Sequence, residues 1–324
     1  MRPSSSVVSL LILLAIAAPA AAQRFSFERS FDVPSRVTLD VSTLGGKIEV
    51  GAGAPGRVVV KGTATVRVAF DVPANAAQLA QRIADSPPIE RDGDVIRLHP
   101  PTDPAERRAA TVAYDVTVPP GTRVSANSIS GAITMSGLSS AMSAQTQSGA
   151  ISITNIDASA DVSSGSGAVT VSGVTGRLTV TTSSSAIRIK DAHESVRVRT
   201  QSGAVDVDVA PTADVDVDVA SSGITVTGLG RSLRAVSTSG KINVAGNPGG
   251  SWTLKSSSGR IEMMLVRGAA FDVDVTTRSG AIALPSGVVA TTQTKRSVRG
   301  RYGRGGALVT VESGSGAVVM RIES

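Results

Sequence analysis

Apolar residues recur along this chain in short alternating groups, and the groups repeat at a constant spacing. The clearest marker is a four-residue unit of Ser, Gly (Ser in the fourth copy), Ala and a β-branched residue. Successive units begin 18 residues apart, at Ser130–Ile133, Ser148–Ile151, Ser166–Val169, Ser184–Ile187 and Ser202–Val205. A fixed period of this kind indicates a repeat protein in which each period is one supersecondary unit.

Within each period, two clusters of apolar residues alternate with polar ones, as in strands with one buried face. Counted from the Gly of the unit, the first cluster lies two and four positions on, as at Ile151 and Ile153. The second lies eleven and thirteen positions on, as at Ala160 and Val162. The position six residues on holds residue types that tolerate positive φ in a tight corner, namely Gly137, Asn155, Gly173 and Asp191.

This pattern predicts an all-β fold, a single-stranded β-solenoid (β-helix) with about 18 residues per turn. Like residues of successive turns would stack in columns about 4.8 Å apart. A stack of turns buries a continuous apolar core, which one turn alone cannot do. The alternative is an antiparallel β-sandwich or meander, because hairpins also alternate apolar and polar positions.

The register also divides the chain. Residues 23–64 are expected to form the first solenoid turn or turns, and residues 121–324 the repeats. Residues 65–120 break the pattern and predict a small α/β insertion or cap near the N-terminus, with a small separate domain as the alternative. Its expected parts are an amphipathic helix over Asn75–Asp85, a hairpin turn at Asp92-Gly93 and a strand over Val112–Val118.

The first 22 residues have the layout of a secretory signal peptide. Arg2 gives the positive start, Leu10–Ala18 the apolar stretch, and Ala20–Ala22 the small residues for cleavage. An uncleaved membrane anchor is the alternative. The chain is therefore expected in the periplasm, on the cell surface or outside the cell, without an integral membrane span in its mature form. Because it has no cysteine, its core and backbone hydrogen bonds must stabilise it without disulfides.

The net charge of +6 favours anionic partners such as glycans. Aromatic residues make up only 2% of the chain, whereas single-stranded nucleic-acid surfaces interleave basic and aromatic side chains. No nucleic-acid partner is therefore expected.

Charged residues on the outward positions fall opposite one another in neighbouring turns. Such cross-strand pairs are expected to hold the register between turns more than to add stability. The predicted structural charge pairs join Arg188 and Lys190 to Asp206 and Asp208, and Arg197 and Arg199 to Asp216 and Asp218.

A second cluster of charge lies near the C-terminus, where the regular pattern is lost between residues 285 and 308. Guanidinium groups bind phosphate and carboxylate oxygens, so the cluster is a possible anion or glycan contact. The alternative is an exposed loop that replaces one turn. The candidate residues are Lys295, Arg296, Arg299, Arg301, Tyr302 and Arg304.

No catalytic constellation is expected. His99 and His193 are the only histidines, and neither stands in a zinc-ligand spacing. The Asp-x-Asp strings, such as Asp272 to Asp274, could supply calcium ligands, but a solvated strand face paired with Arg and Lys explains them without a metal. The sequence thus predicts no metal, no cofactor and no enzyme, with a polysaccharide-active β-helix lyase or hydrolase as the alternative.

The run from Tyr114 to Pro119, Gly121 and the recurring Ser-Gly-Ala-Ile units resemble a bacterial family of exported β-strand-repeat proteins labelled "putative adhesin", of unknown function. The resemblance covers about Phe25 to Ile322 and implies a solenoid-like fold in the cell envelope. The expected function is a non-enzymatic scaffold or binding surface for an envelope component or glycan. A self-associating structural envelope protein, joined through its solenoid ends, is a further alternative.

Overall fold

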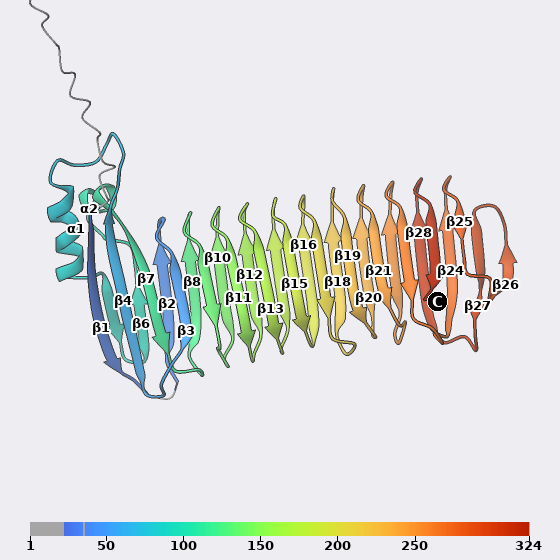
Figure 1. Cartoon of the computed structure of the whole chain (residues 1–324), viewed down its shortest axis with the longest axis horizontal. Helices are drawn as coiled ribbons and strands as arrows, with labels where there is room; N and C mark the ends of the chain where they lie inside the picture. The colour runs from blue at the N-terminus through green and yellow to red at the C-terminus, as the bar shows by residue number, and fades with distance from the viewer. Residues whose placement is uncertain (1–22, 35, 324) are drawn as a thin grey trace, which may run out of the picture.

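A computed structural model describes residues 23–34 and 36–323, which form two long sheets lying face to face along one axis (Figure 1). Sheet A has 14 strands and sheet B has 15. The chain passes from one sheet to the other, so that each turn gives one strand to each. The predicted signal peptide, residues 1–22, lies outside the described residues.

The regular turns occupy the middle of the rod. Their strands in sheet B are β8 (Arg123–Ser128), β10 (Met142–Thr146), β12 (Ala160–Ser164), β14 (Leu178–Thr182), β16 (Ser195–Thr200), β18 (Asp214–Val219), β20 (Leu233–Ser237) and β22 (Trp252–Ser256). Their strands in sheet A are β9 (Ile133–Ser136), β11 (Ile151–Ile156), β13 (Val169–Val174), β15 (Ile187–Ala192), β17 (Val205–Val209), β19 (Ile224–Leu229), β21 (Ile242–Gly246) and β23 (Ile261–Leu265).

Neighbouring strands of these turns pair in parallel. Ile151 lies opposite Val169 in sheet A, and Ala160 lies opposite Leu178 in sheet B, each 18 residues on. The predicted solenoid is therefore confirmed. The sandwich or meander alternative is wrong, because its neighbouring strands would have to be antiparallel.

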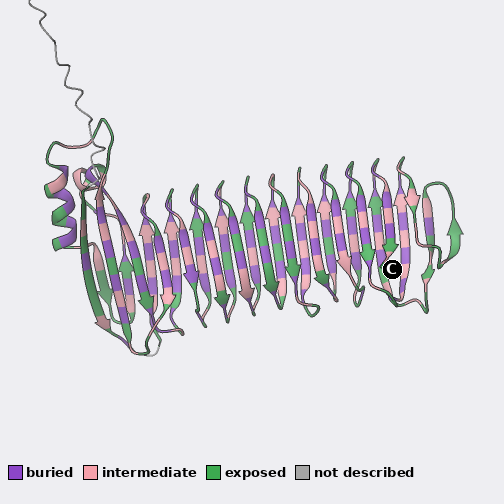
Figure 2. Ribbon diagram, viewed as in Figure 1, coloured by how far each residue is buried: buried purple, intermediate pink, exposed green. Residues whose placement is uncertain are grey.

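Buried and exposed residues alternate along the strands, and the buried ones form stripes down the rod (Figure 2). The core is built mainly from Val, Ile, Leu and Ala of the two inner faces. Gly137, Asn155, Gly173 and Asp191 have φ values of 71°, 54°, 67° and 54°, which confirms the predicted left-handed corners.

At the other corner, the glycines of successive turns stack directly on one another. A Cβ built on Gly149 would lie 2.0 Å from the carbonyl oxygen of Gly131, and one on Gly167 would lie 1.8 Å from that of Gly149. At these corners glycine allows the two backbones to approach this closely, and serine takes the same position in two other turns, at Ser185 and Ser222.

A ladder of buried hydroxyls lies beside this glycine column. The Oγ1 of Thr146 accepts a hydrogen bond from the backbone N–H of Gly149 at 3.0 Å, and the Oγ of Ser128 accepts one from the N–H of Gly131 at 2.8 Å. The buried members of the ladder are Thr43, Ser128, Thr146, Ser164, Thr182, Thr200, Ser237, Ser256, Thr277 and Ser313. Each lies three residues before the corner glycine or its replacement, and six of them accept a hydrogen bond from the N–H of that glycine, a buried donor that the parallel ladder leaves free.

The ladder is interrupted once, at Val219, and the neighbouring corner compensates. Ser222 replaces the corner glycine of this turn, and its Oγ accepts a hydrogen bond from the N–H of Gly203 at 3.0 Å. Ser185, the other corner serine, differs, because its buried Oγ has no hydrogen-bond partner within the described part of the chain.

The N-terminal end interlocks turns that are distant in sequence. It contains β1 (Arg24–Asp32), β2 (Thr38–Thr43), β3 (Ile48–Ala52), β4 (Arg57–Val66), α1 (Ala76–Asp85), β5 (Ile89–Asp92), β6 (Val95–Leu98), α2 (Pro104–Ala109) and β7 (Ala110–Val118). Strand β2 lies between β6 and β8, and β3 lies between β7 and β9. The antiparallel strands β1 and β4 continue sheet A outward from β7.

The expected helix over Asn75–Asp85 forms as α1, and Gly93 turns the hairpin between β5 and β6. The short helix α2 was not expected from the pattern; Asp103 caps it by accepting a hydrogen bond from the N–H of Ala105 at 2.8 Å. Within residues 23–34 and 36–323, no helix has the length and apolar character needed to cross a membrane.

The C-terminal end is interlocked in the same way. It contains β24 (Phe271–Thr277), β25 (Ile282–Ala283), β26 (Val288–Gln293), β27 (Ser297–Tyr302), β28 (Ala307–Ser313) and β29 (Val318–Ile322). The last turn of the sequence, β28–β29, is inserted between β22–β23 and β24–β25. The hairpin β26–β27 then extends sheet B antiparallel to β24. Antiparallel strands thus end both sheets at the N-terminal end and sheet B at the C-terminal end, whereas sheet A ends there in the short parallel strand β25.

Replacing Gly167 with Ala is expected to lower the free energy of unfolding by roughly 2–4 kcal/mol. The added Cβ would meet the Gly149 carbonyl oxygen, which belongs to a backbone that cannot move alone. Gly223→Ala is the matched control, because its Cβ would meet only the Lys241 oxygen at 3.5 Å. Urea unfolding of both variants tests this, and equal stability of the two would contradict it.

Replacing Thr146 with Val keeps the side-chain shape but removes the acceptor of the Gly149 N–H. We expect a loss of about 1–3 kcal/mol, because that buried donor is left without a partner. Thr146→Ser retains the oxygen and should stay close to the parent protein in thermal and urea unfolding. A valine variant as stable as the serine variant would show that the hydroxyl ladder contributes nothing.

Candidate functional site

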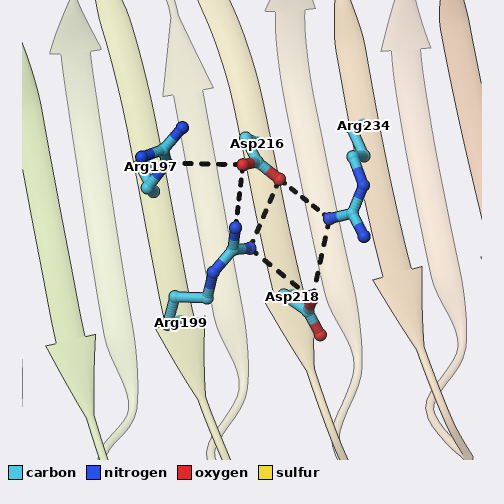
Figure 3. A network of polar contacts seen from close by, with 5 residues as sticks. All are labelled: Arg197, Arg199, Asp216, Asp218 and Arg234. Carbon is cyan, nitrogen blue, oxygen red and sulfur yellow. Dashed lines mark hydrogen bonds and ion pairs between the residues drawn. The ribbon is translucent and has the colours of Figure 1, made fainter.

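The densest set of ion pairs lies on the outward face of sheet B, over β16, β18 and β20. Arg197 and Arg199 stand opposite Asp216 and Asp218, and Arg234 stands opposite Asp216 from the next strand (Figure 3). We refer to these five residues as the charged band. They meet because outward positions of successive turns stack in columns.

Asp216 is at the centre of the charged band. Its carboxylate lies 3.4 Å from Arg197, 3.0 Å from Arg199 and 3.0 Å from Arg234. Burial by itself raises the pKa of Asp216, but the hydrogen bonds from Arg199 and Arg234 outweigh burial, so the pKa lies below its usual value. Asp218 completes the band, 3.6 Å from both Arg199 and Arg234.

An open groove of about 530 Å³ crosses the band. Besides the charged residues, hydroxyl side chains line it, those of Thr179, Ser195, Ser232, Ser251 and Thr253. Arg177 also lines the groove, and within the described residues it has no carboxylate partner. Hydroxyl and guanidinium donors can bind sugar hydroxyls and carboxylates.

Some of the predicted charge pairs form and others do not. Arg197, Arg199, Asp216 and Asp218 lie together, and Arg188 lies 4.0 Å from Asp206 on sheet A. Lys190 and Asp208 form no ion pair in the part of the chain that the structure describes, contrary to the expectation. The pairing of β15 with β17 shifts between Ile189 and Ala192, and Asp208 instead accepts a hydrogen bond from Thr227 at 2.9 Å.

The sequence reasoning missed Arg234 and the pair between Arg231 and Asp214, whose atoms lie 3.5 Å apart. Arg234 stands 18 residues after Asp216, so the same register, carried one turn further, would have located it. Arg231 lies before β20, where the strand pattern gives no direction for the side chain.

The C-terminal basic cluster lies on the hairpin β26–β27 and the turn that follows it, so that three of its six residues stand on a strand and three in turns. Lys295 and Arg296 lie in the hairpin turn, Arg299 and Arg301 on β27, and Arg304 in the next turn. The pattern missed these strands because they are antiparallel additions and do not belong to the 18-residue repeat.

The cluster is only partly neutralised. Arg299 donates to Asp274 on β24 at 2.9 Å. Within the described chain, four exposed basic residues of the cluster have no ion-pair partner, namely Lys295, Arg296, Arg301 and Arg304. Tyr302 stands apart from them, because its ring stacks on Phe271 with 5.3 Å between centroids and an interplanar angle of 18°. It covers the end of the core and its face is not free for a ligand.

Five aspartates of the acidic strings have basic partners, whereas Asp208 and Asp272 form no ion pair in the described chain. Asp206, Asp214, Asp216, Asp218 and Asp274 each lie within ion-pair distance of an arginine. No group of three or more His, Cys, Asp or Glu side chains in the described residues is arranged to hold a metal ion. His99 and His193 lie near Glu90 and Asp191, at 3.3 and 3.0 Å.

A family model, Toastrack DUF4097, matches residues 116–321. The chain belongs to the Toastrack DUF4097 family. The match spans the regular turns and the interlocked C-terminal end, and it agrees with the resemblance carried by the Ser-Gly-Ala-Ile units.

Two solved structures are also similar to this Toastrack chain. One, described as a "putative cell adhesion protein" of Clostridium sporogenes, is 9% identical with a TM-score of 0.21, over 92% of this chain and 98% of its own. The other, a "putative adhesin" of Bacteroides fragilis, is 10% identical with a TM-score of 0.29, over 92% and 97%. Scores this low carry no argument about the function of the chain. No curated protein matches the sequence.

Replacing Asp216 with Asn is expected to destabilise the Toastrack chain by roughly 1 kcal/mol at pH 7, because three arginines then face a neutral side chain. The folded pKa of Asp216 is depressed, so its contribution is complete above the unfolded value of about 4 and is lost as the pH falls through the folded pKa. The difference from the parent protein should therefore shrink towards pH 3. Urea midpoints at pH 7, 5 and 3 measure it.

Asp161→Asn is the control for this prediction. Asp161 is an exposed carboxylate on β12, with no ion pair in the described part of the chain. A loss at Asp161 equal to that at Asp216, or a difference at Asp216 that does not change with pH, would contradict the role given to the charged band.

Proposed function

We propose that this Toastrack chain is an exported, non-enzymatic envelope protein whose C-terminal hairpin binds anionic polysaccharide. The observation that carries the proposal is the unpaired charge of the hairpin. Lys295, Arg296, Arg301 and Arg304 are exposed and lack carboxylate partners in the described chain, whereas Arg197, Arg199 and Arg234 are held by aspartates.

The contrast between the two sets of arginines supports a ligand at the hairpin. An arginine already paired with a carboxylate has part of its charge neutralised and fewer N–H donors free, so it attracts a further anion less strongly. The hairpin cations have no such partner, and guanidinium groups bind carboxylates with paired hydrogen bonds. A uronate polymer presents carboxylates at regular intervals and could contact several of them at once, which raises its affinity.

The solenoid supports a presenting role. Sheet B, with 15 strands spaced about 4.8 Å apart, is roughly 65 Å long. The core is continuous along this length, so the hairpin is held at one end of a stiff support. The predicted signal peptide agrees with a place outside the cytoplasm. A long, stiff rod with a binding surface at one end would suit an adhesin-like scaffold.

The test is retention on immobilised polygalacturonate, with neutral dextran as the comparison matrix. We expect salt-sensitive retention on polygalacturonate alone, since salt screens exposed charges. Arg301→Ser with Arg304→Ser should weaken binding roughly tenfold, the equivalent of about 1.4 kcal/mol. Neither side chain makes a hydrogen bond or ion pair to a described residue, so the fold should be unaffected.

The matched control is Arg36→Ser with Arg123→Ser, which removes the same charge from exposed positions outside the hairpin and the groove, neither with an ion pair in the described chain. Equal weakening by the two double variants would mean that only net charge matters, and the hairpin site would be wrong. Absence of retention at low salt would reject the polysaccharide itself. Shortening of the polymer during incubation would favour the enzyme alternative.

A further inference from the structure

Large apolar side chains are exposed at seven positions in the described residues. Four of them lie at the N-terminal end, including the two most exposed, and the other three, Met264, Val289 and Leu308, lie towards the C-terminal end. Val68 is 89% exposed and Phe70 is fully exposed, at 113% of the reference value. Leu44 and Ile129, at 40% and 45%, lie at the same end of the rod. We call Leu44, Val68, Phe70 and Ile129 the apolar rim.

Leu44 and Ile129 occupy the tip of the Ser-Gly corner in two adjacent turns. The N–H of Ile129 donates to the Thr43 carbonyl oxygen at 3.2 Å, and the Ser130 hydroxyl donates to that of Leu44 at 3.2 Å. Later turns carry polar or small residues at this tip, namely Gln147, Gly165, Ser183, Gln201, Ala220, Thr238, Ser257, Arg278 and Gly314. An apolar tip is therefore a property of this end of the solenoid and not of the repeat.

Val68 and Phe70 lie on the loop between β4 and α1, which protrudes from the cap (Figure 1). Val66 and Val72, on either side, pack against the small cluster of Ala76, Leu79 and Ala109. The ends of the loop are thus held by the core of the cap, while Val68 and Phe70 face outward. An aromatic side chain in this position has no stabilising role in the described fold.

The loop and the corner tips belong to one surface. Arg67 precedes Val68, and it lines a cleft of about 120 Å³ together with Leu44 and Ser130. The Arg67 N–H donates to the carbonyl oxygen of Ala109 at 2.9 Å, so Arg108 also lies beside the loop.

The rim is flanked by positive charge. Arg24 lies next to β4, opposite Thr65, and with Arg67 and Arg108 it surrounds the start of the loop. Each of the three is exposed. Asp71 is the single acidic residue between Val66 and Asn75. Exposed aliphatic and aromatic side chains bordered by arginine are typical of surfaces that enter the interface of an anionic bilayer.

The position of the leader points to the same partner. The N–H of Val66 donates to the carbonyl oxygen of Gln23 at 2.9 Å, so residues 1–22 join the described chain beside the loop. If the leader stayed attached, as in the uncleaved-anchor alternative, its apolar stretch Leu10–Ala18 would enter a membrane at this end.

We propose that the apolar rim rests in the interface of an anionic lipid bilayer, with Val68 and Phe70 inserted and the flanking arginines on lipid phosphates. The hairpin β26–β27 then points away from the membrane, at the opposite end of the rod. The rim and the hairpin share no residue, so the lipid contact stands or falls independently of polysaccharide binding.

The experiment uses a local fluorescent probe. Because the chain has no cysteine, Ala69→Cys places one environment-sensitive label between Val68 and Phe70, and Ser286→Cys places another at the far end. With vesicles containing phosphatidylglycerol, the emission at position 69 should shift to the blue and gain intensity, while that at position 286 stays unchanged. Pure phosphatidylcholine vesicles should give a weaker response.

Val68→Ser with Phe70→Ser, in the Ala69→Cys chain, should reduce partitioning of the probe roughly tenfold or more. Val289→Ser with Leu308→Ser is the matched control, because it removes exposed apolar side chains at the other end of the rod. A leader that is still attached would hold both variants on vesicles equally, so the emission at position 69 is the readout and not sedimentation.

Three outcomes would overturn the proposal. The first is no change at position 69 with either lipid, which would leave a protein partner as the occupant of the rim. The second is an equal change at positions 69 and 286. The third is emission that is already blue-shifted before vesicles are added, because the leader or a second copy of the chain would then cover the rim.

Discussion

Each turn of the solenoid brings its backbone against that of the next at the Ser-Gly corner, and this contact sets the spacing of everything else. The carbonyl oxygen of Gly131 lies where a side chain on Gly149 would begin, so the two strands that leave each corner can approach to hydrogen-bonding distance. Once that spacing is set, outward and inward side chains alike must stack in columns. The hydroxyl ladder and the charged band both result from it, since a residue in one turn meets the residue about 18 positions away.

Much of this could be predicted from the sequence, because the constraint repeats. The period, the parallel columns, the left-handed corners at Asn155 and Asp191 and the contacts of Arg197 and Arg199 with the aspartates all follow from counting positions. The hydroxyl ladder was not predicted from the sequence, although Thr146 and Ser164 recur as regularly as the glycines. Ser and Thr at strand ends are usually read as surface residues, and only the corner geometry gives their hydroxyls a buried donor. The predicted ion pairs of Lys190 and Asp208 do not form, for a local reason. The pairing of β15 with β17 shifts at this point, and the offset pattern of the sequence contains no sign of that shift.

The ends could not be predicted in the same way. Thr277 to Gly280 and Ser313 to Gly316 carry the same corner marker, so either turn could stack on β23 as far as the pattern is concerned. The order of the last turns depends instead on what they bury. The ring of Tyr302 covers Phe271 when the hairpin β26–β27 pairs with one edge of β24, and β28 then occupies the other edge of β24. The charged hairpin was found from its composition, but its strands lie outside the repeat and left no periodic signal.

The same stacking explains why the candidate contacts lie at the two ends. In the middle of the rod every outward side chain has a neighbour in the turn before and the turn after, so an arginine can meet an aspartate there, as Arg199 meets Asp216 and Asp218. Arg177 is an exception, without such a partner in the described chain. A terminal strand has a neighbour on one side only. Arg301 and Arg304 belong to the added hairpin and the turn after it at one end, and Val68 and Phe70 belong to a loop at the other. None of the four lies in the stacked columns of the repeat. Partners are therefore expected at the ends of the rod, and the two ends differ: the hairpin end exposes Val289 and Leu308 among unpaired basic residues, whereas the other end exposes Val68 and Phe70 on a loop bordered by arginine.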